Sequence, residues 1–325
     1  MLCSDAEIAE EFRGYYTDLY ASSQQGDSGV ASYLEGLTLP SLLPEESESL
    51  EADIRIDEVI AAISRLRVGK SPGSDGFTPA FYKQYCEIIA PVLMRLYNSF
   101  AIDGPFPSSM SEAVVSVILM TGKDPSRCDS YRLISLLNID AKLFSGILAA
   151  RLQPYMQGLV DPDQTGFIPE RGCEDNTRCI LQILDKVDRA RCPALLLVVD
   201  AEKAFDRVHW PFLRLTLCRF GMGPKLQHFI WSAYSAPVAR VRVNGTRSTA
   251  LAVGRETRQG CPLSPLLYAL YMEPFAERLR RNPRIKGVTI AHMENKLALY
   301  ATNELLMLSN PQESIPGFPE EAEHF

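Results

Sequence analysis

Closely spaced cysteines are absent from this sequence, and histidine is scarce. Its 325 residues include eight cysteines and four histidines, and no two cysteines are separated by just two residues. Zinc ribbons and zinc fingers hold their metal with such pairs, so the spacing excludes both. Scattered cysteines are instead typical of reduced thiols in an intracellular protein, in preference to a disulfide framework.

Long hydrophobic runs are absent too. The longest apolar runs, residues 194–199 and 117–120, have the length of strands, whereas a transmembrane helix needs roughly 20 apolar residues. The first residues, MLCSDAEIAEEF, contain neither a basic stretch nor an apolar one, so we expect no signal peptide. The sequence therefore predicts an intracellular protein with no membrane partner, in either the nucleus or the cytoplasm.

Net positive charge, the usual footprint of a nucleic-acid-binding protein, is absent from the chain as a whole, which carries a net charge of −7. Residues 1–60 hold 14 acidic and 2 basic residues, and residues 312–325 hold 4 acidic residues and no lysine or arginine. Residues 61–311 keep 31 basic against 22 acidic residues, an excess of +9. This basic middle region is compatible with contacts to phosphate groups.

The two acidic ends are expected to lie outside the folded body. Residues 22–49 are rich in Ser, Gly, Glu and Pro, a composition typical of a linker or a poorly ordered arm. We therefore interpret residues 1–55 as an acidic arm and linker and residues 312–325 as an acidic tail. Regular structure is expected to begin with a helix over 56–67, where apolar residues recur at helical spacing.

Helices and short hairpins are interspersed through the rest of the chain, which predicts an α+β fold. The periodicity predicts further helices over 78–100, kinked or interrupted at Pro91, and over 139–155, 175–190, 211–220, 224–234 and 264–281. Apolar or alternating runs predict strands over 113–120, 194–199, 239–243, 296–300 and 304–308. An Asn244-Gly245 turn follows the third of these strands, and residues 301–303 form a tight turn between the last two.

Four features of the middle region could carry chemistry. The strand at 194–199 runs into Asp200, and a carboxylate at the end of a buried strand is a rigid ligand for Mg²⁺, although the same residue could simply cap the next turn. Gln259 and Gly260 precede an apolar helix, and there a glycine lets the backbone approach a ligand closely. The third feature is the turn at 301–303. The fourth is a set of basic side chains that could meet phosphates or remain solvated: Lys70, Arg132, Arg171 and Arg178.

Six segments, in this order along the chain, carry a family resemblance. They read GKSPGSDGFTPAFYK, YRLISLLNIDAKLFSGILAARL, DQTGFIPERG, VVDAEKAFDRV, RQGCPLSPLLYALYMEPFA and KLALYATNELLMLSN. Together they resemble the reverse transcriptase domain of LINE-type non-LTR retrotransposons, over roughly residues 56–311. The resemblance implies a right-hand polymerase fold with a fingers-like region at 56–190 and a palm-like region at 191–311, whose antiparallel sheet is backed by helices. A thumb is expected to be absent, because the chain ends shortly after the last segment.

The same resemblance implies an RNA-directed DNA polymerase that uses an RNA template, a DNA primer, deoxynucleoside triphosphates and Mg²⁺. Asp200 matches the first metal-binding aspartate of the family, and the carbonyl of Ala201 matches a second ligand. Phe205 matches the bulky gate that excludes a ribose 2′-hydroxyl, with an ordinary core aromatic as the alternative.

Five further residues match positions that contact nucleotide or template. Gln259 and Gly260 match the loop that packs on the incoming nucleotide and the template base. Arg132, Arg171 and Lys70 match basic positions near the template or the triphosphate. The resemblance therefore implies that these residues gather around Asp200.

The turn at residues 300–303 departs from the family pattern. The family carries Tyr-Ala-Asp-Asp, whereas this chain has Tyr300, Ala301, Thr302 and Asn303. A hydroxyl and an amide are neutral, so they cannot replace the two carboxylates that help to hold divalent ions beside a triphosphate. We therefore predict a reverse transcriptase domain of retrotransposon origin with impaired catalysis. The alternatives are a non-catalytic nucleic-acid-binding module and a non-functional relic of a retroelement.

Overall fold

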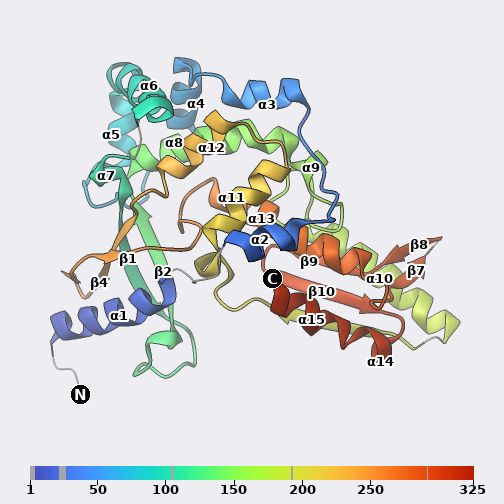
Figure 1. Ribbon diagram of the computed structural model, residues 1–325. Helices are drawn as coiled ribbons and strands as arrows, with labels where there is room; N and C mark the ends of the chain where they lie inside the picture. Colours follow the sequence, from blue (N-terminus) through green and yellow to red (C-terminus); the bar gives the residue numbers. More distant parts are fainter. Residues whose placement is uncertain (1–3, 22–26, 104–105, 192, 291) are drawn as a thin grey trace.

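The computed structural model describes residues 4–21, 27–103, 106–191, 193–290 and 292–325. It contains two β-sheets and a two-stranded ribbon, and helices lie between the two sheets (Figure 1). The first sheet contains β1 (Glu112–Leu119), β2 (Tyr131–Leu137), β4 (Val238–Val243), β5 (Thr246–Arg247) and β6 (Leu251–Ala252). Strand β1 lies between β2, with which it is antiparallel, and β4, with which it is parallel. The predicted α+β class is confirmed.

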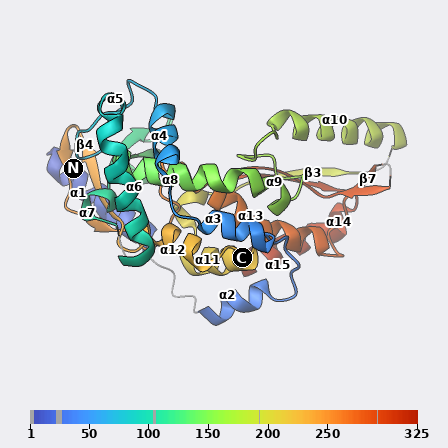
Figure 2. The ribbon, with the colours of Figure 1, turned by 90° about the horizontal axis from the view of Figure 1, so that it is seen from above.

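The second sheet has three antiparallel strands. They are β3 (Leu195–Asp200), β10 (Asn303–Leu308) and β9 (Leu297–Tyr300), in that order across the sheet. The ribbon of β7 (Val288–Ile290) and β8 (Met293–Asn295) lies nearby. Helix α10 (Cys173–Ala190) covers one face of the sheet, and helix α13 (Ser264–Arg281) lies on the other side (Figure 2). The sheet is therefore backed by helices on both faces.

Helix α13 forms the centre of the hydrophobic core. Its residues from 266 to 276 are all buried, which accounts for the nearly continuous apolar sequence there. The larger helices packed around it are α4 (Ile56–Arg65), α6 (Cys86–Asp103), α8 (Ile139–Leu152), α11 (Trp210–Arg219) and α12 (Pro224–Ser232). Shorter helices are α5 (Pro79–Gln84), α7 (Ser108–Ser111), α9 (Met156–Leu159) and α14 (Pro311–Ser314). No helix in the described ranges combines the length and apolar character needed to cross a membrane.

The predicted helix over 78–100 is divided at a different residue from the one expected. Helix α5 ends at Gln84 and α6 begins at Cys86, whereas Pro91 lies inside α6. Tyr85 takes a φ of −107°, outside the helical range, while its ring packs 5.1 Å from that of Phe81. The break expected at Pro91 therefore lies at Tyr85, where the two rings pack together.

The N-terminal segment is part of the fold. Helix α1 (Asp5–Tyr20) begins with a capping box between Ser4 and Glu7, and buries Phe12, Tyr16 and Tyr20 against the first sheet. The expectation of an acidic arm outside the folded body is wrong for these residues. Three aromatic side chains at helical spacing outweigh the acidic composition, since each buries a large apolar surface.

Residues 27–49 of the expected linker also belong to the fold, whereas residues 22–26 lie outside the described residues. Helices α2 (Asp27–Leu34) and α3 (Pro44–Glu51) bury Leu34 and Leu50 in the main core. The acidic tail likewise contains a helix, α15 (Gly317–His324), and the Phe325 ring that follows lies 5.3 Å from that of Phe212 and 5.2 Å from that of Tyr271. Sparse apolar residues thus anchor segments whose overall composition is polar.

Candidate active site

The end of β3 and the turn between β9 and β10 meet at one edge of the three-stranded sheet. Asp200 is the last residue of β3 and pairs in register with Asn303, the first residue of β10. The backbone N–H of Ala201 donates to the carbonyl of Thr302 at 3.4 Å. Because residues directly opposite in an antiparallel pair project from the same face, Asp200 and Asn303 share a face. The fold thus places Asp200 beside Thr302 and Asn303, the two neutral residues of the turn.

A cleft of about 760 Å³ opens at this edge. Four of the predicted site residues line it: Asp200, Ala201, Arg132 and Gln259. A second cleft of about 460 Å³ shares Lys203, Asp206 and Gln259 with the first. Two more predicted residues line the second cleft: Phe205 and Gly260. Six residues chosen from distant parts of the sequence therefore gather around two adjoining hollows.

The loop before α13 is held close to strand β2. Gln259 Oε1 accepts a hydrogen bond from the backbone N–H of Ser135 at 3.1 Å. Gly260 takes a φ of +80°, and a Cβ at this position would stand 2.9 Å from the carbonyl oxygen of Ser135. Glycine is therefore required both by the left-handed backbone and by the close approach.

Phe205 combines core packing with a place on the second cleft. It lies in a short 3₁₀ turn, residues Ala204–Arg207, and is half-buried. Its ring centroid is 4.5 Å from that of Tyr268 on α13 and 6.2 Å from that of Phe167. This placement is compatible with both interpretations of the residue, a gate beside a ribose and a core aromatic.

Positive charge reaches the first cleft from strand β2 and the loop before it. Arg132 is exposed on β2, and Lys123 and Arg127 lie on the preceding loop. The guanidinium of Arg127 is paired with Asp129 at 2.6 Å. Neither Arg132 nor Lys123 makes a salt bridge within the part of the chain that the structure describes. These two side chains therefore offer positive charge to a phosphate group at one side of the cleft. The cleft as a whole is not basic, since its lining holds four basic and five acidic side chains.

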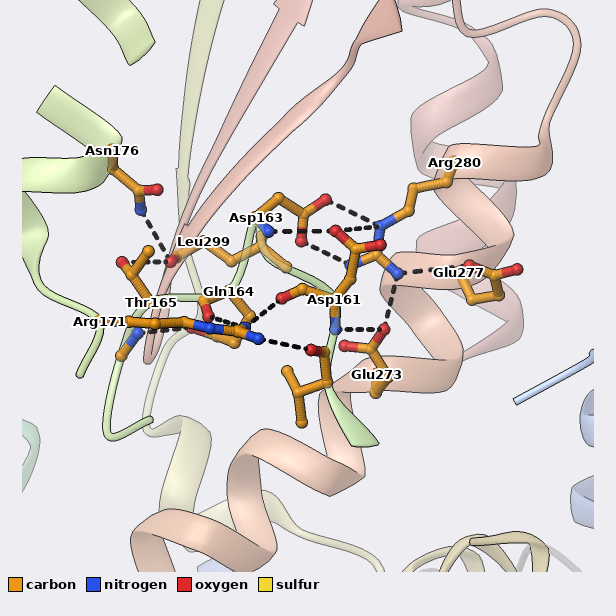
Figure 3. A network of polar contacts seen from close by, with 12 residues as sticks. Asp161, Asp163, Gln164, Thr165, Arg171, Asn176, Glu273, Glu277, Arg280 and Leu299 are labelled. Atoms are coloured by element: carbon orange, nitrogen blue, oxygen red, sulfur yellow. Dashed lines mark hydrogen bonds and ion pairs between the residues drawn. The ribbon is translucent and has the colours of Figure 1, made fainter. Parts of the chain in front are cut away.

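Lys70 and Arg171 do not join this group. Lys70 is exposed in the loop between α4 and α5 and lines neither cleft. Arg171 donates to four backbone carbonyls at 2.6–3.1 Å, those of Gln157, Val160, Asp161 and Gln164 (Figure 3). The structure does not support the nucleotide contact expected of Arg171, because both terminal nitrogens of its guanidinium are bonded to carbonyls of the loop.

Helix α1 forms a wall of the first cleft that the sequence did not predict. Tyr16 lines the cleft, and the ammonium of Lys203 lies 4.4 Å from the ring centroid of Tyr15 and donates to its hydroxyl. The hydroxyl of Tyr20 donates to the carboxylate of Asp206 at 3.3 Å. Asp206 stands six residues after Asp200 in the sequence, but only the packing of α1 shows that this half-buried carboxylate meets a tyrosine.

Glu256 is buried beside this carboxylate and makes stability dependent on pH. Burial raises the pKa of Glu256 to about 8, and the nearby Asp206, whose own pKa is raised by burial, adds to the effect. The folded chain therefore keeps a proton that the unfolded chain releases near the ordinary value of 4.5. This contribution to stability is complete below pH 4.5 and is lost as the pH rises through about 8.

As the pH rises from 4.5 to above about 8, we expect the Glu256→Gln variant to lose less stability than the unmodified chain, because its side chain cannot ionise. The expected difference in the free energy of unfolding at the alkaline end is on the order of a few kcal/mol. Denaturant unfolding at a series of pH values measures it, with Glu11→Gln on the exposed face of α1 as control. Parallel pH profiles for Glu256→Gln and the unmodified chain would contradict the prediction.

The oxygen ligands near Asp200 do not fit a two-metal site. Asp200 supplies a carboxylate and Ala201 a carbonyl, whereas Thr302 and Asn303 offer a neutral hydroxyl and amide. Two divalent ions beside a triphosphate need several anionic oxygens from the protein. No group of three or more His, Cys, Asp or Glu within the described ranges is arranged to hold a metal ion. This donor set is weaker than the one that the sequence resemblance would require.

Comparisons with known proteins agree with the motif order. Residues 122–322 match the family model described as reverse transcriptase (RNA-dependent DNA polymerase). The chain is 30% identical over 302 residues to the transposon TX1 uncharacterized 149 kDa protein of Xenopus laevis, which covers 92% of this chain and 23% of that protein. It is 27% identical over 286 residues to the retrovirus-related Pol polyprotein from the type-2 retrotransposable element R2DM of Drosophila melanogaster. This match covers 85% of this chain and 26% of that protein.

A third relative is the RNA-directed DNA polymerase from the mobile element jockey of Drosophila funebris, 28% identical over 230 residues, which are 69% of this chain and 25% of that protein. The chain thus spans about a quarter of the length of the curated relatives it matches. The family model covers well over half of the chain. The chain therefore belongs to the reverse transcriptase family, as a domain of non-LTR retrotransposon origin.

Proposed function

We propose that this chain is the fingers-like and palm-like part of a right-hand polymerase and that its catalysis is impaired. The three-stranded sheet with Asp200 would be the palm, and the sheet of β1 and β2 with its helices would be the fingers. Strands β4–β6 belong to the first sheet although they lie within residues 191–311, so the two regions share a sheet across the expected boundary.

The observation that carries the impairment is the pairing of Asp200 with Asn303 beside Thr302. If this edge is the catalytic centre, the residues opposite Asp200 stand where two metal-binding aspartates would be. Mg²⁺ would then rest on Asp200 and the carbonyl of Ala201.

The chain's own residues would still bind the other components of the reaction. Arg132 would contact a phosphate of template or triphosphate, since it is exposed on the cleft without an ion-pair partner in the described residues. Phe205 and Gly260 would border the sugar and the base, because both line the second cleft. Gln259 would orient that loop through its bond to Ser135. The expected partners are an RNA template, a DNA primer and deoxynucleoside triphosphates.

The catalytic part of the proposal is tested by primer extension on an RNA template. We expect the unmodified chain to incorporate nucleotides no faster than Asp200→Ala, with either Mg²⁺ or Mn²⁺, because a single carboxylate cannot hold the metal pair. The two proteins are compared at equal concentration by the amount of extended primer. Robust extension that is lost in Asp200→Ala would show that catalysis is intact.

The binding part is tested separately and bears on the alternative of a non-catalytic nucleic-acid-binding module. We expect affinity for an RNA–DNA hybrid to fall with salt, and the slope of the log–log plot to become shallower by about 1 in Arg132→Gln, because one phosphate contact is lost. Arg189→Gln on α10 is the control, since Arg189 is exposed but lines neither cleft. No binding at low salt would leave the chain as a relic without either function.

A further inference from the structure

The loop at residues 161–171, between α9 and α10, lies against the turn that joins β9 and β10 (Figure 3). The backbone N–H of Leu299 donates to the carbonyl of Asp163 at 2.8 Å, and the N–H of Thr165 donates back to the carbonyl of Leu299 at 2.9 Å. The amide of Asn176 on α10 donates to the same carbonyl at 2.9 Å. The loop is thus bonded to the outer edge of β9 just before the turn.

Gln164 and Gly166 contact the turn itself. Gln164 is buried, and its Oε1 accepts from the backbone N–H of Gly166 at 2.9 Å and from that of Ala301 at 3.3 Å. Ala301 takes a φ of +55°, a left-handed conformation that is unfavourable for a residue with a Cβ. A buried side chain therefore satisfies the backbone N–H of the one residue that the turn places in a strained conformation.

Glycine at position 166 is required by the closeness of the turn. A Cβ built there would stand 2.2 Å from the backbone nitrogen of Ala301 and 2.9 Å from the carbonyl carbon of Tyr300. Real Cβ atoms do not approach backbone atoms so closely. Any larger residue must therefore displace either the loop or the turn.

The loop is in turn fixed to the core. Asp163 accepts two hydrogen bonds from the guanidinium of Arg280 on α13, at 2.6 and 2.8 Å (Figure 3). Arg280 also pairs with Glu273 at 2.7 Å. Within the loop, Arg171 donates hydrogen bonds to the carbonyls of Asp161 and Gln164. Because α13 is the most buried helix, it gives the loop a rigid base.

We infer that residues 161–171 are a positioning element for the turn, with Gln164 and Gly166 as positioning residues. They set where residues 302 and 303 stand relative to Asp200. The inference rests on the proposed function, since it takes these three positions as the metal site of the family. Neither residue lines either of the two clefts, and both act through the backbone of Ala301.

The test uses the full chain carrying Thr302→Asp and Asn303→Asp, here called the restored chain. Gly166→Ala is added to it, and Gln164→Met serves as a second variant that removes the acceptor but keeps the side-chain length. Gly158→Ala in α9 is the control, because a Cβ there meets nothing within 4 Å. Two quantities are measured: the affinity for Mn²⁺, and hydrogen exchange at the amides of residues 299–303 compared with those of β3.

We expect Gly166→Ala and Gln164→Met to weaken Mn²⁺ binding at least tenfold and to speed exchange at 299–303 at least tenfold more than in β3. Gly158→Ala should change neither. A residue that only supports the fold would speed exchange throughout the protein and leave the Mn²⁺ affinity of the folded chain unchanged, which would overturn the inference. If the restored chain binds no Mn²⁺ at all, the proposed function fails, while the exchange measurement still decides whether the loop positions the turn.

Discussion

The restored chain is expected to extend a primer on an RNA template that the unmodified chain leaves unextended. Two added carboxylates beside Asp200 would supply the anionic oxygens that a pair of divalent ions needs. Metal-held charge stabilises such a transition state by several kcal/mol, and each ~1.4 kcal/mol is a factor of ten in rate. We therefore expect a gain of on the order of 10²–10³ in the rate of incorporation.

Two controls separate charge from other effects of this substitution. Thr302→Ser with Asn303→Gln changes the same positions without adding charge and should remain inactive. Adding Asp200→Asn to the restored chain should remove the gained activity. The melting temperature provides a second readout, since Mn²⁺ should raise it in the restored chain only, through preferential binding to the folded state. Equal extension by the unmodified and restored chains would contradict the prediction.

Replacing Arg280 is expected to cause the largest loss of stability of any substitution considered. Its side chain is mostly buried and pairs with Asp163 at 2.6 Å and with Glu273 at 2.7 Å. Removing one partner of a buried ion pair leaves the other charge without compensation, at a cost of about 3–5 kcal/mol. We expect Arg280→Met to lower the free energy of unfolding by this amount near neutral pH.

The loss should shrink in mildly acid solution. Burial is the largest influence on both carboxyls and raises the pKa of Glu273 to about 7 and that of Asp163 above its ordinary value, while Arg280 lowers both. Without the guanidinium both pKa values would rise further. Protonation would then neutralise the orphaned carboxyls as the pH falls, so the penalty should be smaller at pH 5 than at pH 8.

Arg281→Met is the matched control, because Arg281 follows on the same helix. Its side chain is 46% exposed and pairs with Glu277, so its removal should cost less than about 1 kcal/mol. Denaturant unfolding of both variants at pH 5 and pH 8 measures the difference. Similar losses for the two arginines would show that the buried network does not hold the loop to α13.

The order of motifs and the strongest periodic segments could be predicted from the sequence. Helix α13 has the predicted bounds, and the hairpin of β9 and β10 lies within a residue of its prediction. A long apolar helix and two short apolar runs around a tight turn leave few alternatives, because local pattern and burial agree. The neutral residues at 302 and 303 could also be read directly from the sequence.

Segments with mixed composition could not be predicted in this way. Helices α1, α2 and α3 lie in acidic, Ser-rich or Pro-rich sequence, and each is anchored by a few apolar side chains that bury against distant elements. Strand β2 was likewise not expected, since residues 131–137 combine polar and apolar positions. Such burial depends on a partner surface that local composition does not contain.

The roles of single basic side chains could not be predicted from the sequence either. Arg132 and Arg171 look alike in sequence, yet Arg132 is exposed on the cleft and Arg171 is bonded to backbone carbonyls. An arginine has several donors in a fixed fork, and whether they meet a ligand or the protein depends on which carbonyls the fold places nearby. Tertiary structure alone made that choice.

The sequence by itself determined the family and the loss of two carboxylates, because both are properties of residue identity in a fixed order. Only the tertiary structure decided that Asp200 stands opposite Asn303, that α1 forms a wall of the cleft, and that a loop anchored on Arg280 is hydrogen-bonded to the turn. These arrangements join residues far apart in the chain, and they follow from packing and from hydrogen bonds between backbone groups that no local pattern encodes.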